Sequence, residues 1–119
     1  MKTINLEQKL STFHDHWNPR ILAQLNGQDV RVAKILGTFD WHHHEHEDEL
    51  FFVLGGRLEM QFRDHTEVVE QGEMIVVPRG VEHRPHADEE TAILLFEPSS
   101  TVNTGNVESD RTRGDLAHI

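Results

Sequence analysis

The sequence contains no cysteine among its 119 residues. Disulfides, thiolate metal ligands and a cysteine nucleophile are therefore excluded. Positive charge is also scarce, because 11 Lys and Arg residues stand against 21 Asp and Glu residues and give a formal net charge of −10. Since binding to phosphate groups needs clustered Lys and Arg, this balance argues against nucleic-acid partners and against anionic membrane surfaces.

Long apolar stretches are absent as well. No segment approaches the roughly 20 apolar residues of a membrane-spanning helix, and residues 1–10 lack the apolar centre of a secretory signal. We therefore expect a cytoplasmic protein that does not associate with membranes. A chain of 119 residues is long enough for a single domain that buries about two-thirds of its unfolded surface.

Two kinds of periodicity predict the secondary structure. Apolar residues at helical spacing, with a capping pair at Asn5 and Gln8, predict a short helix over residues 6–14. Alternating or continuous apolar runs predict strands, and Asn26-Gly27 predicts a hairpin between the first two. The clearest strands cover residues 20–25, 29–36, 50–54, 58–63, 66–70, 74–77 and 92–96. About eight or nine short strands in all indicate an all-β sandwich or barrel.

Histidine and acidic side chains are concentrated in one short stretch. Residues 42–49 read H-H-H-E-H-E-D-E, with four histidines and four acidic residues. An apolar run over residues 50–54 and the pair Gly55-Gly56 follow directly, which predicts a buried strand that ends in a turn. The stretch therefore lies against a core, and this position favours a metal site on a β scaffold.

The spacing within this stretch indicates which side chains can act together. Along a strand, residues i and i+2 point to the same side, about 6.5–7 Å apart, so two imidazoles can converge on one cation at roughly 2.0–2.1 Å. His42 and His44 have this spacing, and His44 and His46 have it too. A bend after His44 can return the carboxylate of Glu49 to the same cation, although neighbouring acidic residues compete for this role.

A further ligand must come from outside the stretch. His83 follows the apolar run 75–77 and a Pro-Arg-Gly turn, which makes it the candidate. His43 has the opposite strand parity, so we expect it outside the site. His46 has the parity of the ligand face, but the bend expected there can turn it to the rim.

Two motifs in this chain resemble those of the cupin superfamily. The first motif has the form G-x(5)-H-x-H-x(3,4)-E-x(6)-G, and the residues that fit it are Gly37, His42, His44, Glu49 and Gly56. Four residues, rather than five, separate its first glycine from its first histidine. The second motif has the form G-x(5)-P-x-G-x(2)-H-x(3)-N, and the residues that fit it are Gly72, Pro78, Gly80 and His83. Ala87 replaces the final asparagine, which is not a metal ligand in the family.

The resemblance implies a fold, a ligand set and an assembly. The implied fold is a double-stranded β-helix, or jelly-roll barrel, similar to the mannose-6-phosphate isomerase-like cupins. It would occupy residues 20–105, after a helical segment over residues 1–19 and before a polar tail over residues 106–119. The implied metal ligands are His42, His44, Glu49 and His83. Zn, Mn, Fe, Ni and Co all suit such a set, because affinity order alone does not choose among them. The resemblance also implies a homodimer that forms through edge strands.

Several functions are compatible with such a site. We expect a metal-binding cupin with a small-molecule pocket in its barrel. A metal-dependent enzyme, of the sugar-phosphate isomerase or dioxygenase type, is one alternative, and a non-catalytic ligand-binding or structural cupin is another. A general base would favour the enzyme, and the candidates in the matched segments are Glu73, Glu82 and His86. The polar tail can be disordered or docked on a neighbouring subunit, and the sequence leaves this open.

Overall fold

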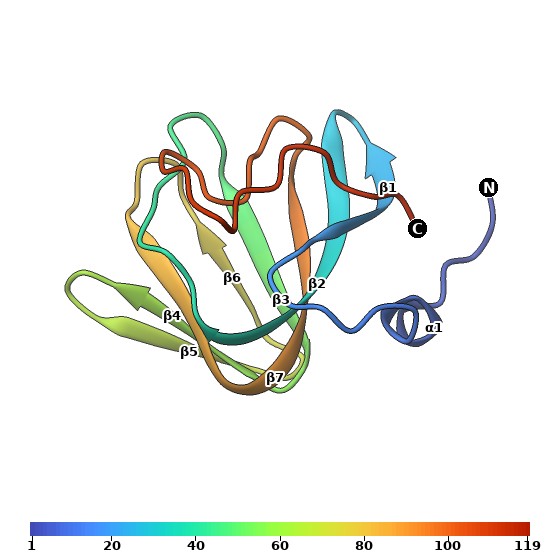
Figure 1. Ribbon diagram of the computed structural model, residues 1–119, viewed down its shortest axis with the longest axis horizontal. Helices are drawn as coiled ribbons and strands as arrows, with labels where there is room; N and C mark the ends of the chain where they lie inside the picture. The colour runs from blue at the N-terminus through green and yellow to red at the C-terminus, as the bar shows by residue number, and fades with distance from the viewer.

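The structure is a computed structural model that describes residues 1–119 of the chain. It contains one helix and seven strands, and none of its helices has the length and apolar character needed to span a membrane. The elements are α1 (Leu6–Leu10), β1 (Arg20–Leu25), β2 (Gln28–Thr38), β3 (Glu49–Gly55), β4 (Arg57–Phe62), β5 (Thr66–Glu70), β6 (Met74–Val77) and β7 (His83–Pro98). Figure 1 shows that the strands form the body of the molecule, with α1 set apart from it.

The predicted all-β architecture is confirmed, with two differences in element length. The helix ends at Leu10, where the predicted helix continued to residue 14. The strands number seven, fewer than the eight or nine expected, and the strand predicted over residues 92–96 is part of the 16-residue strand β7. The hairpin between β1 and β2 forms at Asn26-Gly27 as predicted, and both residues have the positive φ that a tight hairpin turn requires.

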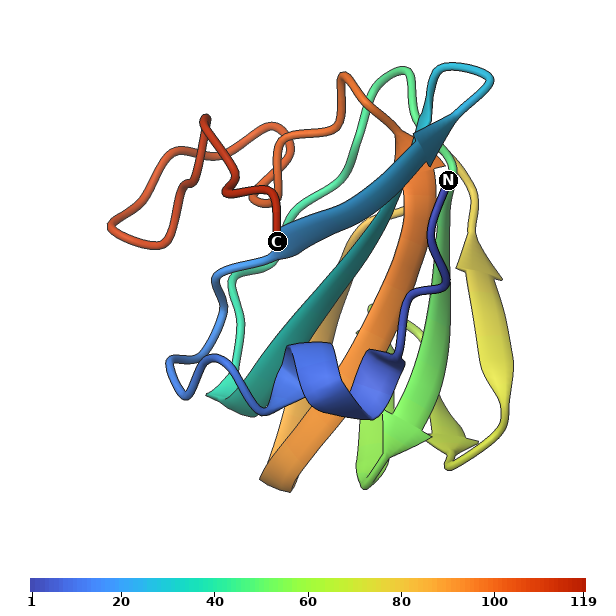
Figure 2. The same cartoon turned by 90° about the vertical axis from the view of Figure 1, so that its right-hand side faces the viewer.

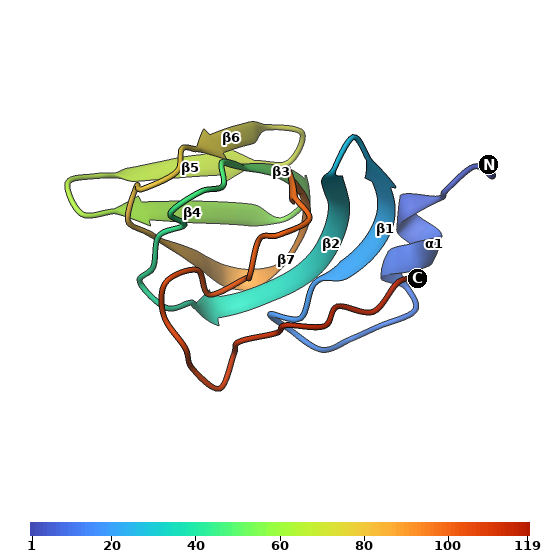
Figure 3. The same ribbon diagram turned by 90° about the horizontal axis from the view of Figure 1, so that it is seen from above.

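The long strand β7 joins the two halves of the barrel. Its C-terminal half pairs with β2 and β3, and its N-terminal half pairs with β2 and β4. The resulting strand order is β1-β2-β7-β3-β6, with β4 and β5 forming a hairpin that attaches through β7. Viewed from above, the strands curve around a central space that lies between β2, β7 and the β3–β6 side (Figure 3).

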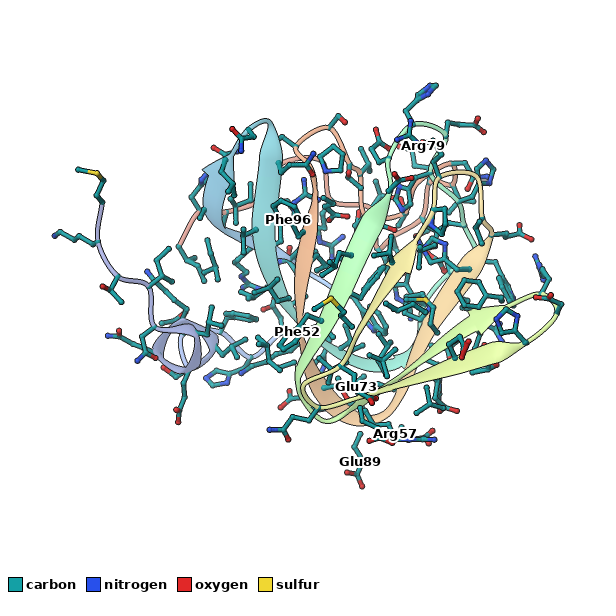
Figure 4. All side chains as sticks on the ribbon, turned by 180° about the vertical axis from the view of Figure 1, so that it is seen from behind. Phe52, Arg57, Glu73, Arg79, Glu89 and Phe96 are labelled. Atoms are coloured by element: carbon teal, nitrogen blue, oxygen red, sulfur yellow. The ribbon has the colours of Figure 1, made fainter.

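Alternation along the strands divides the residues between an inner and an outer face. The inner face holds a core of eleven buried apolar residues, which are Ala33, Ile35, Phe51, Val53, Leu58, Met60, Val69, Val77, Ala87, Ile93 and Leu95. Phe52 and Phe96 follow core residues directly in β3 and β7, so they point to the outer face (Figure 4).

The two ends of the chain are used differently. Phe13 is buried, and Trp17 stacks on Phe39 with ring centroids 4.8 Å apart, so both aromatic rings of the N-terminal segment pack within the chain. Residues 99–119, which we call the C-terminal strap, run across one end of the barrel and return to β1 (Figures 1 and 2). There the backbone of Ile21 pairs with Ala117 and Ile119, at 2.8 and 3.0 Å. The tail is thus folded onto the chain's own barrel.

Candidate metal centre

Residues 39–48, which we call the histidine loop, connect β2 to β3 and carry two of the predicted ligands. The loop is not a regular strand, although the i, i+2 spacing of its histidines was interpreted as that of a strand. Two of its residues bond to the backbone of β7. The N–H of Phe39 donates to the carbonyl of Pro85 at 3.0 Å. The N–H of His42 donates to the carbonyl of His83 at 3.1 Å, and the N–H of His83 donates back at 2.9 Å. The carbonyl of His44 accepts from the N–H of Gly80 at 2.7 Å. These bonds fix the loop against the start of β7.

The structure brings all four predicted ligands together. The residues that gather are His42, His44, Glu49 and His83, and one possible donor atom from each lies within 4.8 Å of the others. Glu49 Oε1 is 2.9 Å from His44 Nε2 and 3.3 Å from His83 Nε2. All four side chains are buried, with at most 4% of each residue exposed. The first residue of β3 therefore places its carboxylate between imidazoles that come from the loop and from β7.

Backbone carbonyls orient two of the imidazoles. His42 Nδ1 lies 2.8 Å from the carbonyl oxygen of Asp40, and His83 Nδ1 lies 2.9 Å from that of Val81. Because a carbonyl oxygen only accepts hydrogen bonds, Nδ1 must carry the proton in both rings. Each Nε2 then keeps a free lone pair, which is the arrangement that metal-bound histidines generally have.

Three of the donor atoms have no hydrogen-bond partner. Although the His44 Nε2, Glu49 Oε1 and His83 Nε2 atoms lie close together, none of them makes a well-directed hydrogen bond. An unsatisfied buried polar atom costs about 1–3 kcal/mol, so three in one place need a compensating partner. A cation fits, since imidazole and carboxylate are the donors that borderline divalent ions prefer.

The electrostatics of the cluster keep its donors ready to bind a cation. Burial lowers the pKa of His42 from 6.5 to about 4, and repulsion from His83 adds to this effect, so the ring is neutral near pH 7. Burial alone would raise the pKa of Glu49. The polar groups of Glu97, His44 and His83 beside its carboxylate outweigh burial and hold this pKa well below its usual range.

A second buried network, which the motifs did not indicate, lies beside the cluster. Arg31 donates to Asp29 Oδ2 from two nitrogens, at 2.8 and 3.0 Å, and to Glu97 Oε1 at 3.0 Å. Burial and the charge of Glu49 raise the pKa of Glu97 well above its usual range, although Arg31 acts in the opposite direction. Glu97 is therefore a buried carboxyl group that contacts a candidate metal ligand. Its only sequence signal was an acidic residue at an inward position of a buried strand.

The donors border a small cavity inside the barrel. Its volume is about 40 Å³, which is room for about three water molecules. The residues that line it are Trp17, Pro19, Ala33, Ile35, Phe39, His42, Glu49, Phe51, Pro85, Ile93, Leu95, Glu97 and Asn103. Most of this lining is apolar, and the few polar groups lie close to the candidate metal ligands. No Lys or Arg takes part in it.

The other histidines of the motif region lie away from the cluster. His43 binds Glu45 with 2.6 Å between Nε2 and Oε1, and His46 is exposed, so neither belongs to the buried group. His65 is exposed in the turn after β4. The candidate general bases are also remote, since none of Glu73, Glu82 and His86 lines the cavity.

Trp41, next to His42, contacts two arginines. The Cζ atoms of Arg63 and Arg84 lie 3.9 and 4.8 Å from its ring centroid. Arg84 is thereby held on Trp41, while Arg57 and Arg79 point outward (Figure 4) and bind Glu70 and Asp48. These arginines are therefore not positioned to hold a ligand in the cavity.

Comparison with known proteins places the chain among proteins of the same fold. Residues 26–97 match the cupin domain. The chain is 44% identical to a cupin-2 domain containing protein from Shewanella frigidimarina, whose structure superimposes with a TM-score of 0.80 over 81% of this chain and 94% of that one. A structure from Neisseria meningitidis is 34% identical, with a TM-score of 0.76 over 82% of this chain and all of the other. The protein YdbB of Bacillus subtilis is 38% identical over 64% of this chain and 68% of its own length.

Proposed function

The chain belongs to the cupin family, and from this premise we propose that it binds a divalent transition-metal ion together with a small ligand in its barrel. The proposed metal ligands are His42, His44, Glu49 and His83. The observation that carries the proposal is the set of three buried donor atoms that lack hydrogen-bond partners. Folding leaves these atoms unsatisfied unless something binds them, and a cation would satisfy them all.

The surrounding residues prepare the site for such an ion. The carbonyls of Asp40 and Val81 hold two imidazoles in the tautomer that coordinates through Nε2. The stacked rings of Trp17 and Phe39 line the cavity and make this part of its wall apolar. When bound, a divalent ion would supply Lewis-acid polarisation of an oxygen donor on the ligand.

The cavity defines the class of ligand. Its small volume and apolar lining favour a small, largely uncharged molecule with an oxygen donor near the histidines. Because Glu49 and Glu97 line it and no Lys or Arg does, a phosphate group there would meet negative charge without a counter-charge. This argues against a sugar phosphate as the ligand.

An enzymatic role is a second candidate, and Glu97 is the observation that favours it. Among the carboxyl groups that line the cavity, Glu97 is the one outside the proposed ligand set. A buried carboxyl group with a raised pKa can donate a proton to a bound substrate. Turnover that is lost in Glu97→Gln, with metal content unchanged, would favour catalysis over binding alone.

Metal analysis of the purified protein tests the main proposal. We expect about one transition-metal ion per chain, and the same stoichiometry when stripped protein is reloaded. Zn, Mn, Fe, Ni and Co should be tried separately, followed by a screen of small uncharged ligands on the loaded protein. Failure of all five ions to bind at micromolar concentration would refute the proposal.

We further propose that the protein forms a homodimer. Phe13 and Trp17 pack within the chain, so they are not available to a partner. The outer face of the large sheet instead has two apolar rows in register across β2, β7, β3 and β6. The rows are Val30, Phe96, Leu50, Val76 and Val32, Leu94, Phe52, Met74, of which Val32 is buried within the chain and is not available to a partner.

A second copy of the chain suits this outer face. The two rows contain no charged residue, so the acidic character of the chain does not bring like charges together at their centre. Met74 and Val76 are 58% and 54% exposed, and they lie in β6, which is an edge strand of this sheet. Light scattering should give twice the chain mass for the wild type and a monomer for Val76→Lys. A wild-type monomer at tens of micromolar would contradict this arrangement.

A further inference from the structure

We propose that the C-terminal strap positions the histidine loop for metal binding and that Asn106 is the residue through which it acts. This inference rests on the proposed metal site. Asn106 Oδ1 accepts from the N–H of His43 at 2.8 Å, and the N–H of Asn106 donates to the carbonyl of His43 at 2.9 Å. Since His43 lies between His42 and His44, both bonds hold the segment that carries two of the four proposed ligands.

At Gly105, the residue before Asn106, the backbone of the strap lies close to His42 and His43. Gly105 has φ +55°, and a Cβ atom built there would overlap the carbonyl oxygen of His43 and lie 3.1 Å from His42 Cδ2. A larger residue would therefore push the strap off the loop or displace the imidazole. This close approach explains why glycine is required beside Asn106.

The strap also holds the residue that orients His42. Ser109 Oγ donates to Asp40 Oδ2 at 2.7 Å, and Arg111 Nη1 lies 3.4 Å from Asp40 Oδ1. The carbonyl of the same Asp40 accepts the hydrogen bond from His42 Nδ1. Strap contacts therefore reach His42 from two directions, through its neighbour His43 and through Asp40.

The loop needs this support because its own structure is sparse. Within residues 39–48 only Phe39 and His42 bond to the backbone of a strand, so the position of His44 depends on bonds from outside the loop. The strap is itself anchored, because its far end pairs with Ile21 in β1. Holding ligands in place before the ion arrives reduces the entropy lost on binding, and partners behind metal ligands typically affect metal affinity about 10–100-fold.

The test is Co²⁺ binding to metal-free, full-length protein, followed by visible absorption and by competition with a chelator. Asn106→Ala removes the side-chain bond to His43 and should weaken Co²⁺ binding about tenfold or more. Asn106→Asp keeps an acceptor oxygen at the same place and should restore most of the affinity. Arg113→Ala is the matched control, because the Arg113 side chain bonds only to carbonyls within the strap. Its affinity should equal that of the wild type.

Urea denaturation of the metal-free variants separates positioning from general stability. A weaker Co²⁺ affinity of Asn106→Ala, with its urea midpoint close to that of Arg113→Ala, supports the inference. Unchanged affinity in Asn106→Ala overturns it while leaving the proposed metal site intact. Absence of Co²⁺ binding by the wild type would instead refute the metal site itself. Ser109→Ala provides a second variant. The Ser109 hydroxyl reaches the histidine loop only through Asp40, so its loss should weaken binding by a smaller factor than Asn106→Ala.

Discussion

Two clusters of histidine and carboxylate side chains lie on this barrel, one inside it and one outside. The inner cluster is His42, His44, Glu49 and His83, and the outer one is Glu59, His86 and Asp88. In both clusters a possible donor atom from each residue lies within 4.8 Å of the others. Proximity of donors therefore does not distinguish the two.

Hydrogen-bond satisfaction does distinguish them. In the outer cluster His86 Nδ1 lies 2.7 Å from Thr38 Oγ1, and His86 Nε2 lies 2.7 Å from Asp88 Oδ1, so the ring has two partners. In the inner cluster the nitrogens facing the carboxylate lack such partners. The side chain of Asp88 is 72% exposed, whereas that of Glu49 is 4% exposed. Bulk water can therefore solvate the outer cluster, whereas the inner cluster is closed off from bulk solvent.

The largest effect should come from removing a buried donor. His44→Ala and His83→Ala each delete an imidazole that the closed site cannot replace, so metal content after loading should fall to near zero. His43→Ala is the matched control, because His43 bonds to Glu45 outside the cluster and its loss should leave metal content near that of the wild type. Elemental analysis of the three variants checks this.

The His46→Ala variant also tests which histidines are the metal ligands. Its side chain is exposed, so His46→Ala should retain the metal. Loss of metal in His46→Ala together with retention in His42→Ala would mean that His44 and His46 form the ligand pair. The role of Glu49 would then have to be abandoned as well.

Removing the metal should have the next largest effect. The unfolded chain has no preformed site, so the free energy of metal binding adds to that of folding. At a free metal concentration of 1,000 times Kd, this amounts to about 4 kcal/mol, or on the order of 10 °C in Tm for a chain of this size. Calorimetry of loaded protein with and without chelator measures it. Identical melting curves would show that the inner cluster gains nothing from an ion.

Acid should destabilise the metal-free protein through the inner cluster. The pKa of His42 is about 4 in the folded state and 6.5 in the unfolded chain. Protons therefore bind the unfolded chain preferentially as pH falls from 6.5 to 4, and the contribution of His42 to stability is lost over this range. The loss is about 3 kcal/mol. Urea denaturation across this pH range is the measurement.

Glu97 requires a control in the same experiment. Because its folded pKa is raised, its protonation favours the folded state as pH falls and opposes the effect of His42. The comparison should therefore be made between the wild type and His42→Gln. The pH dependence that disappears in His42→Gln belongs to His42, and equal slopes in the two proteins would refute the assignment.

The sequence predicted the parts of the fold and site that depend on local pattern. The β1–β2 hairpin followed from the conformational preferences of Asn26-Gly27, and His83 followed from the second motif. The sequence could not predict that β7 is continuous over 16 residues, since this depends on pairing with strands on both sides. The contact of Asn106 with the histidine loop could not be predicted from local sequence patterns either, because its partner His43 is 63 positions away in the chain. Likewise, the pairing of Arg31 with Glu97 arises only when β2 and β7 are adjacent.

The smallest effect should come from the outer cluster. His86→Ala removes the single histidine of that group, but the ring is already bonded to Thr38 and Asp88 and is open to solvent on one side. Its loss should leave the metal stoichiometry of the loaded protein unchanged and should lower the free energy of unfolding by about 1 kcal/mol or less, as expected for partly exposed hydrogen bonds. Elemental analysis beside His83→Ala provides the comparison, since both variants remove one imidazole from β7. A fall in stoichiometry in His86→Ala would mean that the outer cluster also binds an ion, and that unsatisfied buried donors are not what distinguishes a metal site in this barrel.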